Sequence, residues 1–173
     1  MTNPFAIFDL PVTFNIDLGL LSSRYLELQK SLHPDNFVTA DSATQRQAMQ
    51  KALEINDALK VLRDPVQRAE AIIAIETGNA VDPEQRSTQD VAFLMQQLEW
   101  REELEDIEQK ADDATLNRFA QRIKQARLQL LNTLNDALTD RNWHLATQSC
   151  DKLRFIEKLN SEIERVEEHL FEL

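Results

Sequence analysis

Glycine is scarce in this sequence of 173 residues. Only Gly19 and Gly78 occur, where average usage would give roughly a dozen, and proline occurs five times. Hairpin turns and nucleotide-cradling loops need residues that adopt positive φ, which glycine supplies most readily. The shortage therefore argues against all-β folds, dinucleotide-binding units and phosphate-binding loops, and it predicts an all-helical protein.

Cysteine, basic charge and long apolar runs are also in short supply. The single cysteine, Cys150, allows no intramolecular disulfide and no thiolate zinc site, which is typical of a reducing compartment. Acidic side chains outnumber basic ones by 30 to 19, for a net charge of −11, which disfavours nucleic acids and anionic membranes. No stretch approaches the ~18 apolar residues of a membrane span, and no export signal is recognisable. We expect a cytoplasmic protein without nucleic-acid or membrane partners.

Two helices are predicted before the first chemically distinctive motif. Asn3 followed by Pro4 is typical of a cap and first helical position, so a short helix should run to about Asp9. Asp17 can cap a second helix, which must end before Pro34 because proline disfavours helical geometry in the residue that precedes it. Apolar residues at steps of three and four give this helix one buried stripe, consisting of Leu18, Leu21, Tyr25, Leu28 and Leu32.

Two more helices follow in the first half. Ser42 and Gln45 form a capping-box pattern that opens a third helix, and Asp64 with Pro65 starts a fourth, which Gly78 can end. The stripes of the second and third helices are expected to pack together as an antiparallel pair. The stripe of the third helix consists of Ala48, Ala52, Ile55, Leu59 and Leu62.

The remaining chain predicts a separate helical domain. A polar, turn-forming stretch divides the sequence into a first domain (1–75), a linker (76–87) and a second domain (88–173), and the second domain holds most of the excess acid. Its pattern predicts a three-helix bundle with helices at about 88–111, 114–139 and 142–171.

His33-Pro34-Asp35 stands between the second and third helices. One interpretation is structural: Pro34 stops the helix, His33 interacts with its negative end and Asp35 stabilises the turn. The functional interpretation is a contact device, because proline makes the tip rigid and projects an imidazole and a carboxylate that a partner arginine can meet. No nucleophile or second acid lies nearby, so we expect neither an enzyme nor a cofactor or metal site.

The helix at 88–111 is apolar on two sides. At about 100° per residue, Phe93, Trp100, Leu104, Ile107 and Ala111 share one arc, which we expect in the core. One interpretation of the other side is packing against the first domain. The alternative is a protein-binding surface that selects a basic partner. This other side consists of Val91, Leu94, Met95 and Leu98, continued by Glu99, Glu102 and Asp106.

Several segments resemble known co-chaperones. NPFAIF, SLHPDNF and EINDALKVLRDP resemble a J domain, the module that activates ATPase chaperones of the DnaK type. RAEAII, DVAFLMQQLEWREELEDIEQ and KLRFIEKL extend the resemblance over the whole chain to the HscB family of bacterial iron-sulfur cluster assembly. The resemblance implies an L-shaped, all-helical, two-domain co-chaperone. Such a protein brings the cluster scaffold IscU to the chaperone HscA and stimulates ATP hydrolysis there.

The resemblance also implies two sets of site residues. His33, Pro34 and Asp35 would contact the chaperone, with Arg24 and Lys30 as the only basic residues of the second helix. Asn36 departs from many J domains, which have lysine there. Phe155 can either reach outward or belong to the edge of the core. The implied scaffold-binding set is Leu94, Met95, Leu98, Glu99, Glu102 and Phe155, to which the helical angles add Asp106.

Two alternatives remain open at this point. The first is a J-type co-chaperone with another client, which would differ only in the second domain. The second is a structural helical module that dimerises through its acidic second half, with the histidine motif a coincidence. We expect a monomer, which leaves the patch on the 88–111 helix free for another protein.

Overall fold

The computed structural model describes residues 3–80 and 90–172. The chain divides into two compact units, Met1–Ala80 and Val81–Leu173. Every regular element in the described ranges is helical, as the shortage of glycine predicts. In those ranges, no helix combines the length and apolarity that crossing a membrane requires.

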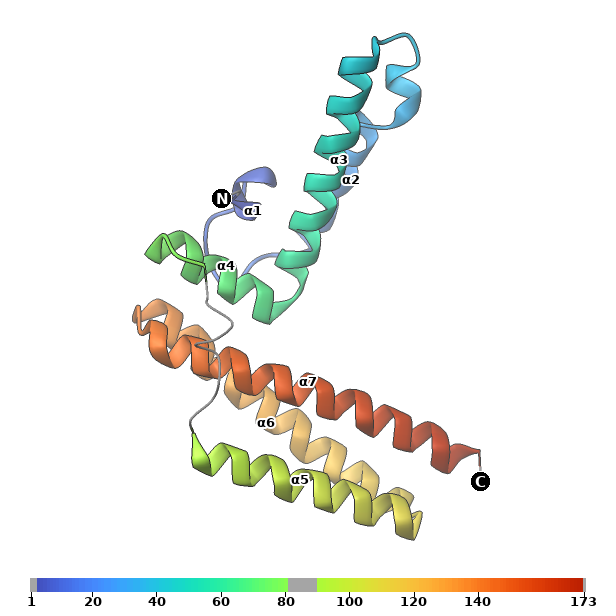
Figure 1. Cartoon of the computed structure of the whole chain (residues 1–173), viewed down its shortest axis with the longest axis vertical. Coiled ribbons are helices and arrows are strands. Elements are labelled where there is room, and N and C mark those ends of the chain that lie inside the picture. The colour runs from blue at the N-terminus through green and yellow to red at the C-terminus, as the bar shows by residue number, and fades with distance from the viewer. Residues whose placement is uncertain (1–2, 81–89, 173) are drawn as a thin grey trace. The chain divides into compact units, whose positions relative to one another are not determined.

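The first unit is built on a helical hairpin. α2 and α3 run side by side in opposite directions, and α1 lies beside α3 (Figure 1). The buried side chains include Phe5 and Phe8 from the first segment, and Leu21 and Leu62 from the two arms of the hairpin. Leu18, expected on the buried stripe of α2, is exposed. The elements are α1 (Pro4–Ile7), α2 (Leu18–Ser31), the 3₁₀ helix η1 (Pro34–Phe37), α3 (Ser42–Arg63) and α4 (Pro65–Thr77).

Local capping chemistry sets most of these boundaries. The side chains of Asn3, Asp17 and Asp64 accept first-turn backbone N–H groups of α1, α2 and α4 at 2.9, 3.0 and 2.9 Å. Gly78 ends α4 in the left-handed conformation at φ 75°, where glycine pays no Cβ penalty. These four predicted boundaries are confirmed. Of the predicted linker, 76–77 belong to α4 and 81–87 lie outside the described residues.

The start of α3 differs from its prediction by one residue. Asp41, not Ser42, is the N-cap, and its side chain accepts the Thr44 N–H at 2.9 Å. Gln45 does not complete a capping box, because its amide donates to the carbonyl oxygens of Phe37 (2.9 Å) and Ala40 (3.4 Å). It therefore ties the preceding loop to α3. The Asp41 carboxylate caps α3 in place of the Ser42 hydroxyl, because a carboxylate accepts a charge-assisted and therefore stronger hydrogen bond.

A buried arginine fixes the corner between α3 and α4. Arg68 donates from Nη1 to the Leu62 carbonyl oxygen at 2.6 Å, and its guanidinium lies 4.8 Å from the centroid of the Phe14 ring. Burial lowers the pKa of Arg68, although the nearby Asp64 carboxylate opposes this shift. These contacts orient α4 against the end of the hairpin.

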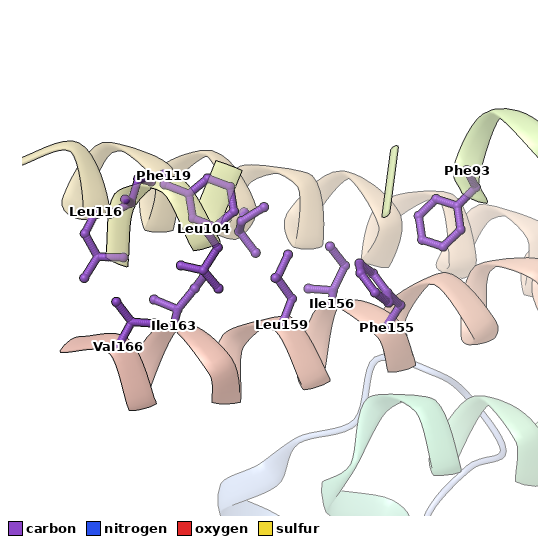
Figure 2. Close-up of a cluster of buried hydrophobic side chains, with 11 residues drawn as sticks. Phe93, Leu104, Leu116, Phe119, Phe155, Ile156, Leu159, Ile163 and Val166 are labelled. Carbon is purple, nitrogen blue, oxygen red and sulfur yellow. The ribbon is translucent and has the colours of Figure 1, made fainter. Parts of the chain in front are cut away.

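The second unit is a three-helix bundle of α5 (Val91–Lys110), α6 (Asp113–Thr139) and α7 (Trp143–Phe171). Its core joins Leu104 of α5 and Phe119 of α6 to Ile163 of α7 (Figure 2). Ala111, which we expected in this core, is exposed and ends α5 in the left-handed conformation at φ 50°. The helical wheel placed Ala111 in the core because it assumed that the helix continues to residue 111, but α5 ends at Lys110.

Candidate functional site

The His33-Pro34-Asp35 motif forms a tight, exposed turn. His33 is the N-cap of η1, and its Nδ1 accepts the backbone N–H of Asp35 at 3.2 Å. The side chains of His33 and Asp35 are 60% and 86% exposed, with Nδ1 and Oδ2 3.4 Å apart. An Nδ1 atom that accepts a hydrogen bond leaves Nε2–H of the neutral imidazole as a donor. The exposure expected of both side chains is confirmed.

Asn36 ties this turn to the end of α2. Its side-chain amide donates to the carbonyl oxygens of Lys30 at 2.7 Å and Ser31 at 3.3 Å, and its backbone N–H donates to the His33 carbonyl at 2.9 Å. The last carbonyls of a helix have no partner within the helix. Asn36 therefore satisfies two of them and restrains the motif, a role that sequence reasoning missed.

A half-open groove of about 510 Å³ lies beside the motif, between α2 and α3. Its lining includes the apolar side chains of Leu32, Ala52 and Ile55 and the polar side chains of Lys30 and His33. Leu26 also lines the groove although 55% of it is exposed. Leu26 was not among the site residues predicted from the sequence. Its position outside the buried stripe of α2 could have marked it as an exposed leucine.

The two basic residues of α2 differ in their surroundings. Lys30 is exposed and lines the groove beside His33. Arg24 is half-buried, and its guanidinium donates to the carbonyl oxygens of Phe8 and Asp9 at the end of α1. One nitrogen of Arg24, Nη1, therefore holds the end of α1 against α2, and a contact between the charge of Arg24 and the chaperone stays a prediction.

The outer side of α5 carries an exposed apolar surface. Leu94, Met95 and Leu98 are 44%, 58% and 62% exposed, and we call these three residues the α5 face. Glu99 and Glu102 are exposed beside it. Asp106 is exposed too, but its carboxylate is 3.0 Å from Lys110 Nζ, so it contributes less unpaired negative charge. The structure thus groups the predicted residues of this helix on one surface.

Phe155 is not part of that surface. Its side chain is 8% exposed and packs in the bundle core against Phe93 (Figure 2) and against Trp100. The interpretation in which Phe155 reaches outward is wrong, and the alternative, an edge-of-core residue, is confirmed. The rotation of α7 about its own axis turns Phe155 toward α5. A helical wheel drawn for one helix does not contain this rotation.

Known proteins of one kind are similar to this chain over its full length. The chain is 60% identical over 173 residues to a co-chaperone HscB homologue of Haemophilus influenzae, covering 100% of this chain and 99% of the relative. It is 55% identical over 170 residues to the homologue of Pasteurella multocida, with 98% and 99% covered. The profile described as "HSCB C-terminal oligomerisation domain" matches residues 89–164.

Solved structures are similar as well. Chaperone HscB from Vibrio cholerae superposes with a TM-score of 0.91 at 42% identity, covering 97% of this chain and 99% of that one. The human co-chaperone HscB shares the fold, with a TM-score of 0.85 at 22% identity, covering 95% of this chain and 81% of that one. These relatives are named as chaperones or co-chaperones, not as enzymes. With a J domain ahead of a three-helix bundle and full-length relatives of this kind, the chain belongs to the HscB family of co-chaperones.

Proposed function

We propose that this protein is a co-chaperone of iron-sulfur cluster assembly that binds the scaffold IscU, delivers it to the DnaK-type chaperone HscA and stimulates the ATPase of that chaperone. The observation that carries the proposal is the exposed pair of His33 and Asp35 on a restrained turn. Membership of the HscB family and the separate α5 face on the other unit support it.

The chaperone contact follows from the chemistry of the turn. The Asp35 carboxylate can accept two parallel hydrogen bonds from an arginine, a geometry that guanidinium groups favour. The imidazole of His33 offers Nε2–H to an acceptor on the same partner. An apolar side chain of the chaperone can enter the groove that includes Leu26, and Lys30 adds one positive charge at its edge. Recognition thus combines a directional polar contact with apolar burial.

The scaffold contact depends on a different kind of surface. Leucine and methionine side chains of the α5 face supply apolar area, and flexible Met95 can adapt to the partner. Glu99 and Glu102 beside this area favour a basic segment of the scaffold. Since the two contacts lie on separate units, both partners can be held by one chain.

Coupling follows from holding both partners on one chain. The chaperone and the scaffold are brought to a high local concentration, so the second binding event becomes effectively intramolecular. The basic residues of α2 are Arg24 and Lys30, and Glu27 on the same helix opposes them, so α2 offers little net positive charge for steering. The encounter with the chaperone should therefore depend only modestly on salt, and it should be strengthened by the bound scaffold.

Replacing His33 tests the chaperone contact. His33→Gln should leave the far-ultraviolet circular dichroism spectrum unchanged and lower the melting temperature only slightly, because the exposed side chain caps only the four-residue η1, yet it should remove stimulation of the HscA ATPase. His144→Gln, at an exposed position of α7, is the matched control and should retain stimulation. A His33→Gln protein that stimulates normally would contradict the proposal.

Replacing two residues of the α5 face tests the scaffold contact. Leu94→Ala combined with Leu98→Ala should weaken IscU binding, measured by calorimetry, by about tenfold, beyond the effect of an ordinary surface change. Stimulation of HscA in the absence of scaffold should remain. Leu128→Ala, an exposed leucine on α6, is the control. Unchanged IscU binding by the double variant would remove the α5 face from the proposal.

Self-association is a second candidate function. The description of the matching family profile names an oligomerisation domain, and the α5 face supplies exposed apolar area. Sedimentation velocity over a hundredfold concentration range separates the candidates. A dimer that the Leu94→Ala, Leu98→Ala variant abolishes would favour self-association, whereas a monomer throughout leaves the face for the scaffold.

A further inference from the structure

Few core side chains attach the first half of α5 to the bundle. The buried residues of α5 are Phe93, Leu104 and Ile107, and the last two lie in its second half. Between Phe93 and Leu104, only Trp100 packs against the core among the apolar side chains. The turns that carry the α5 face are thus attached mainly by two aromatic rings.

These rings meet a third ring from α7. The centroid of Phe93 lies 5.8 Å from that of Phe155 at an interplanar angle of 89°, and 6.4 Å from that of Trp100 at 83°. The rings of Trp100 and Phe155 are stacked, with centroids 6.2 Å apart at 9°. Edge-to-face and stacked pairs stabilise beyond their buried area. We call Phe93, Trp100 and Phe155 the aromatic clasp, of which Figure 2 shows Phe93 and Phe155.

A polar contact closes the same end of α5. Asp90 caps the helix by accepting the Phe93 N–H at 3.1 Å, and its other oxygen lies 3.0 Å from Lys152 Nζ of α7. The ammonium group of Lys152 also lies 5.4 Å from the centroid of the Phe93 ring. The first turn of α5 is therefore tied to α7 through its cap as well as through its aromatic side chains.

The clasp and the α5 face lie on different sides of one helix. At about 100° per residue, Trp100 returns to within about 20° of Phe93, whereas the α5 face is centred about 150° away. A helix turns as a rigid body over such a short length. Any rotation or fraying that the clasp prevents would therefore move Leu94, Met95 and Leu98 out of register with a partner.

We propose that the aromatic clasp positions the first half of α5, and that Phe155 acts on scaffold binding through Phe93 and Trp100 without touching the scaffold. This inference rests on the proposed function of the α5 face. It makes Phe155 a positioning residue, and it predicts an effect that is visible in the free protein. A residue that only contacts the partner would have no such effect.

Hydrogen exchange of the full chain tests the clasp without any partner. Phe155→Leu keeps an apolar side chain but removes the ring, and it should speed exchange of the amides at 95–102 about tenfold over those of α6 and α7. Phe119→Leu is the matched control, because it makes the same change in the buried core beside the second half of α5. It should affect the bundle without selecting 95–102.

Binding to IscU, measured by calorimetry, supplies the second readout. Phe155→Leu should raise Kd about tenfold, whereas Phe155→Tyr keeps the ring and should restore both affinity and protection. Lys152→Gln removes the ion pair with Asp90 and the cation over the Phe93 ring, and it keeps all three rings of the aromatic clasp. It should increase exchange at 95–102 in the same direction by a smaller factor, and it provides the test if Phe155→Leu does not fold.

Each combination of results decides the matter. Weaker binding by Phe155→Leu with unchanged exchange at 95–102 would make Phe155 a contact residue and overturn the inference. Faster exchange with unchanged binding would overturn the positioning role. Failure of the proposed function is distinguishable, because Leu94→Ala with Leu98→Ala would then leave IscU binding intact whatever the state of the clasp.

Discussion

The side-chain amide of Asn36 donates a hydrogen bond of 2.7 Å to the backbone carbonyl of Lys30. This bond joins the residue that follows His33-Pro34-Asp35 to the last turn of α2, whose carbonyls have no partner within the helix. The motif is thereby held at a fixed place relative to the groove between α2 and α3. Where many J domains have a lysine, Asn36 has a side-chain amide that donates hydrogen bonds to the backbone of α2.

Asn36→Ala should destabilise the protein and weaken its action on the chaperone. We expect the free energy of unfolding to fall by about 1 kcal/mol, the usual contribution of a hydrogen bond, and stimulation of the HscA ATPase to fall severalfold. Urea unfolding and steady-state ATPase assays measure the two effects. Asn132→Ala, at an exposed position within α6, should change neither. Full stimulation by Asn36→Ala would show that the motif needs no such restraint.

Leu26→Ala should weaken the chaperone contact without weakening the fold. Leu26 is exposed although it lines the groove beside His33, so its truncation should alter the free energy of unfolding by no more than about 0.5 kcal/mol. The concentration of co-chaperone that half-stimulates HscA should rise several-fold, about tenfold at most. Leu128→Ala tests for general effects of losing an exposed leucine. Equal stimulation curves for the two variants would exclude the groove from the contact.

Arg24→Lys separates a structural role from a role in electrostatic steering. Lysine keeps the charge but lacks the planar fork that donates to the carbonyls of Phe8 and Asp9. We expect the free energy of unfolding, measured in urea, to fall by about 1–2 kcal/mol. Lys30→Arg, on the same helix and exposed, should be neutral. If Arg24→Lys is as stable as the unsubstituted protein, the tie between α1 and α2 contributes nothing.

Acid should destabilise the protein through a small set of carboxylates. Hydrogen bonds from Thr44, Lys152 and Thr115 lower the pKa values of Asp41, Asp90 and Asp112, respectively. A hydrogen bond from Arg165 likewise lowers the pKa of Glu108. A carboxyl group with a lowered pKa in the folded state contributes stability above its unfolded pKa, about 3.9 for Asp and 4.3 for Glu. That contribution is lost as the pH falls through the folded value.

The urea midpoint should therefore be insensitive to these groups between pH 5 and 8 and should fall below about pH 4. Asp90→Asn can still cap α5 but cannot lose a charge, so its midpoint should fall less steeply over the acid range than that of the unsubstituted protein. A midpoint that rises on acidification below pH 4 would contradict the role of these carboxylates.

Much of the fold was predictable from short-range signals. Asn3, Asp17, Asp64 and Gly78 act on backbone groups within a few residues of themselves, so the sequence pattern was sufficient to locate four boundaries. Asp41 was missed only because a neighbouring serine matched a capping pattern as well. The exposure of His33 and Asp35 was also predictable, because Pro34 ends the helix and makes both side chains project from the tip of the hairpin.

The sequence by itself determined where the helices begin and end, which of their sides are apolar and which motif stands at the tip of the hairpin. Only the tertiary structure decided what those sides meet. Phe155 and Arg24 both looked available to a partner, yet one stacks on Trp100 and the other donates to the carbonyls at the end of α1. Such contacts depend on the rotation and spacing of packed helices, which many side chains set together and no local pattern records.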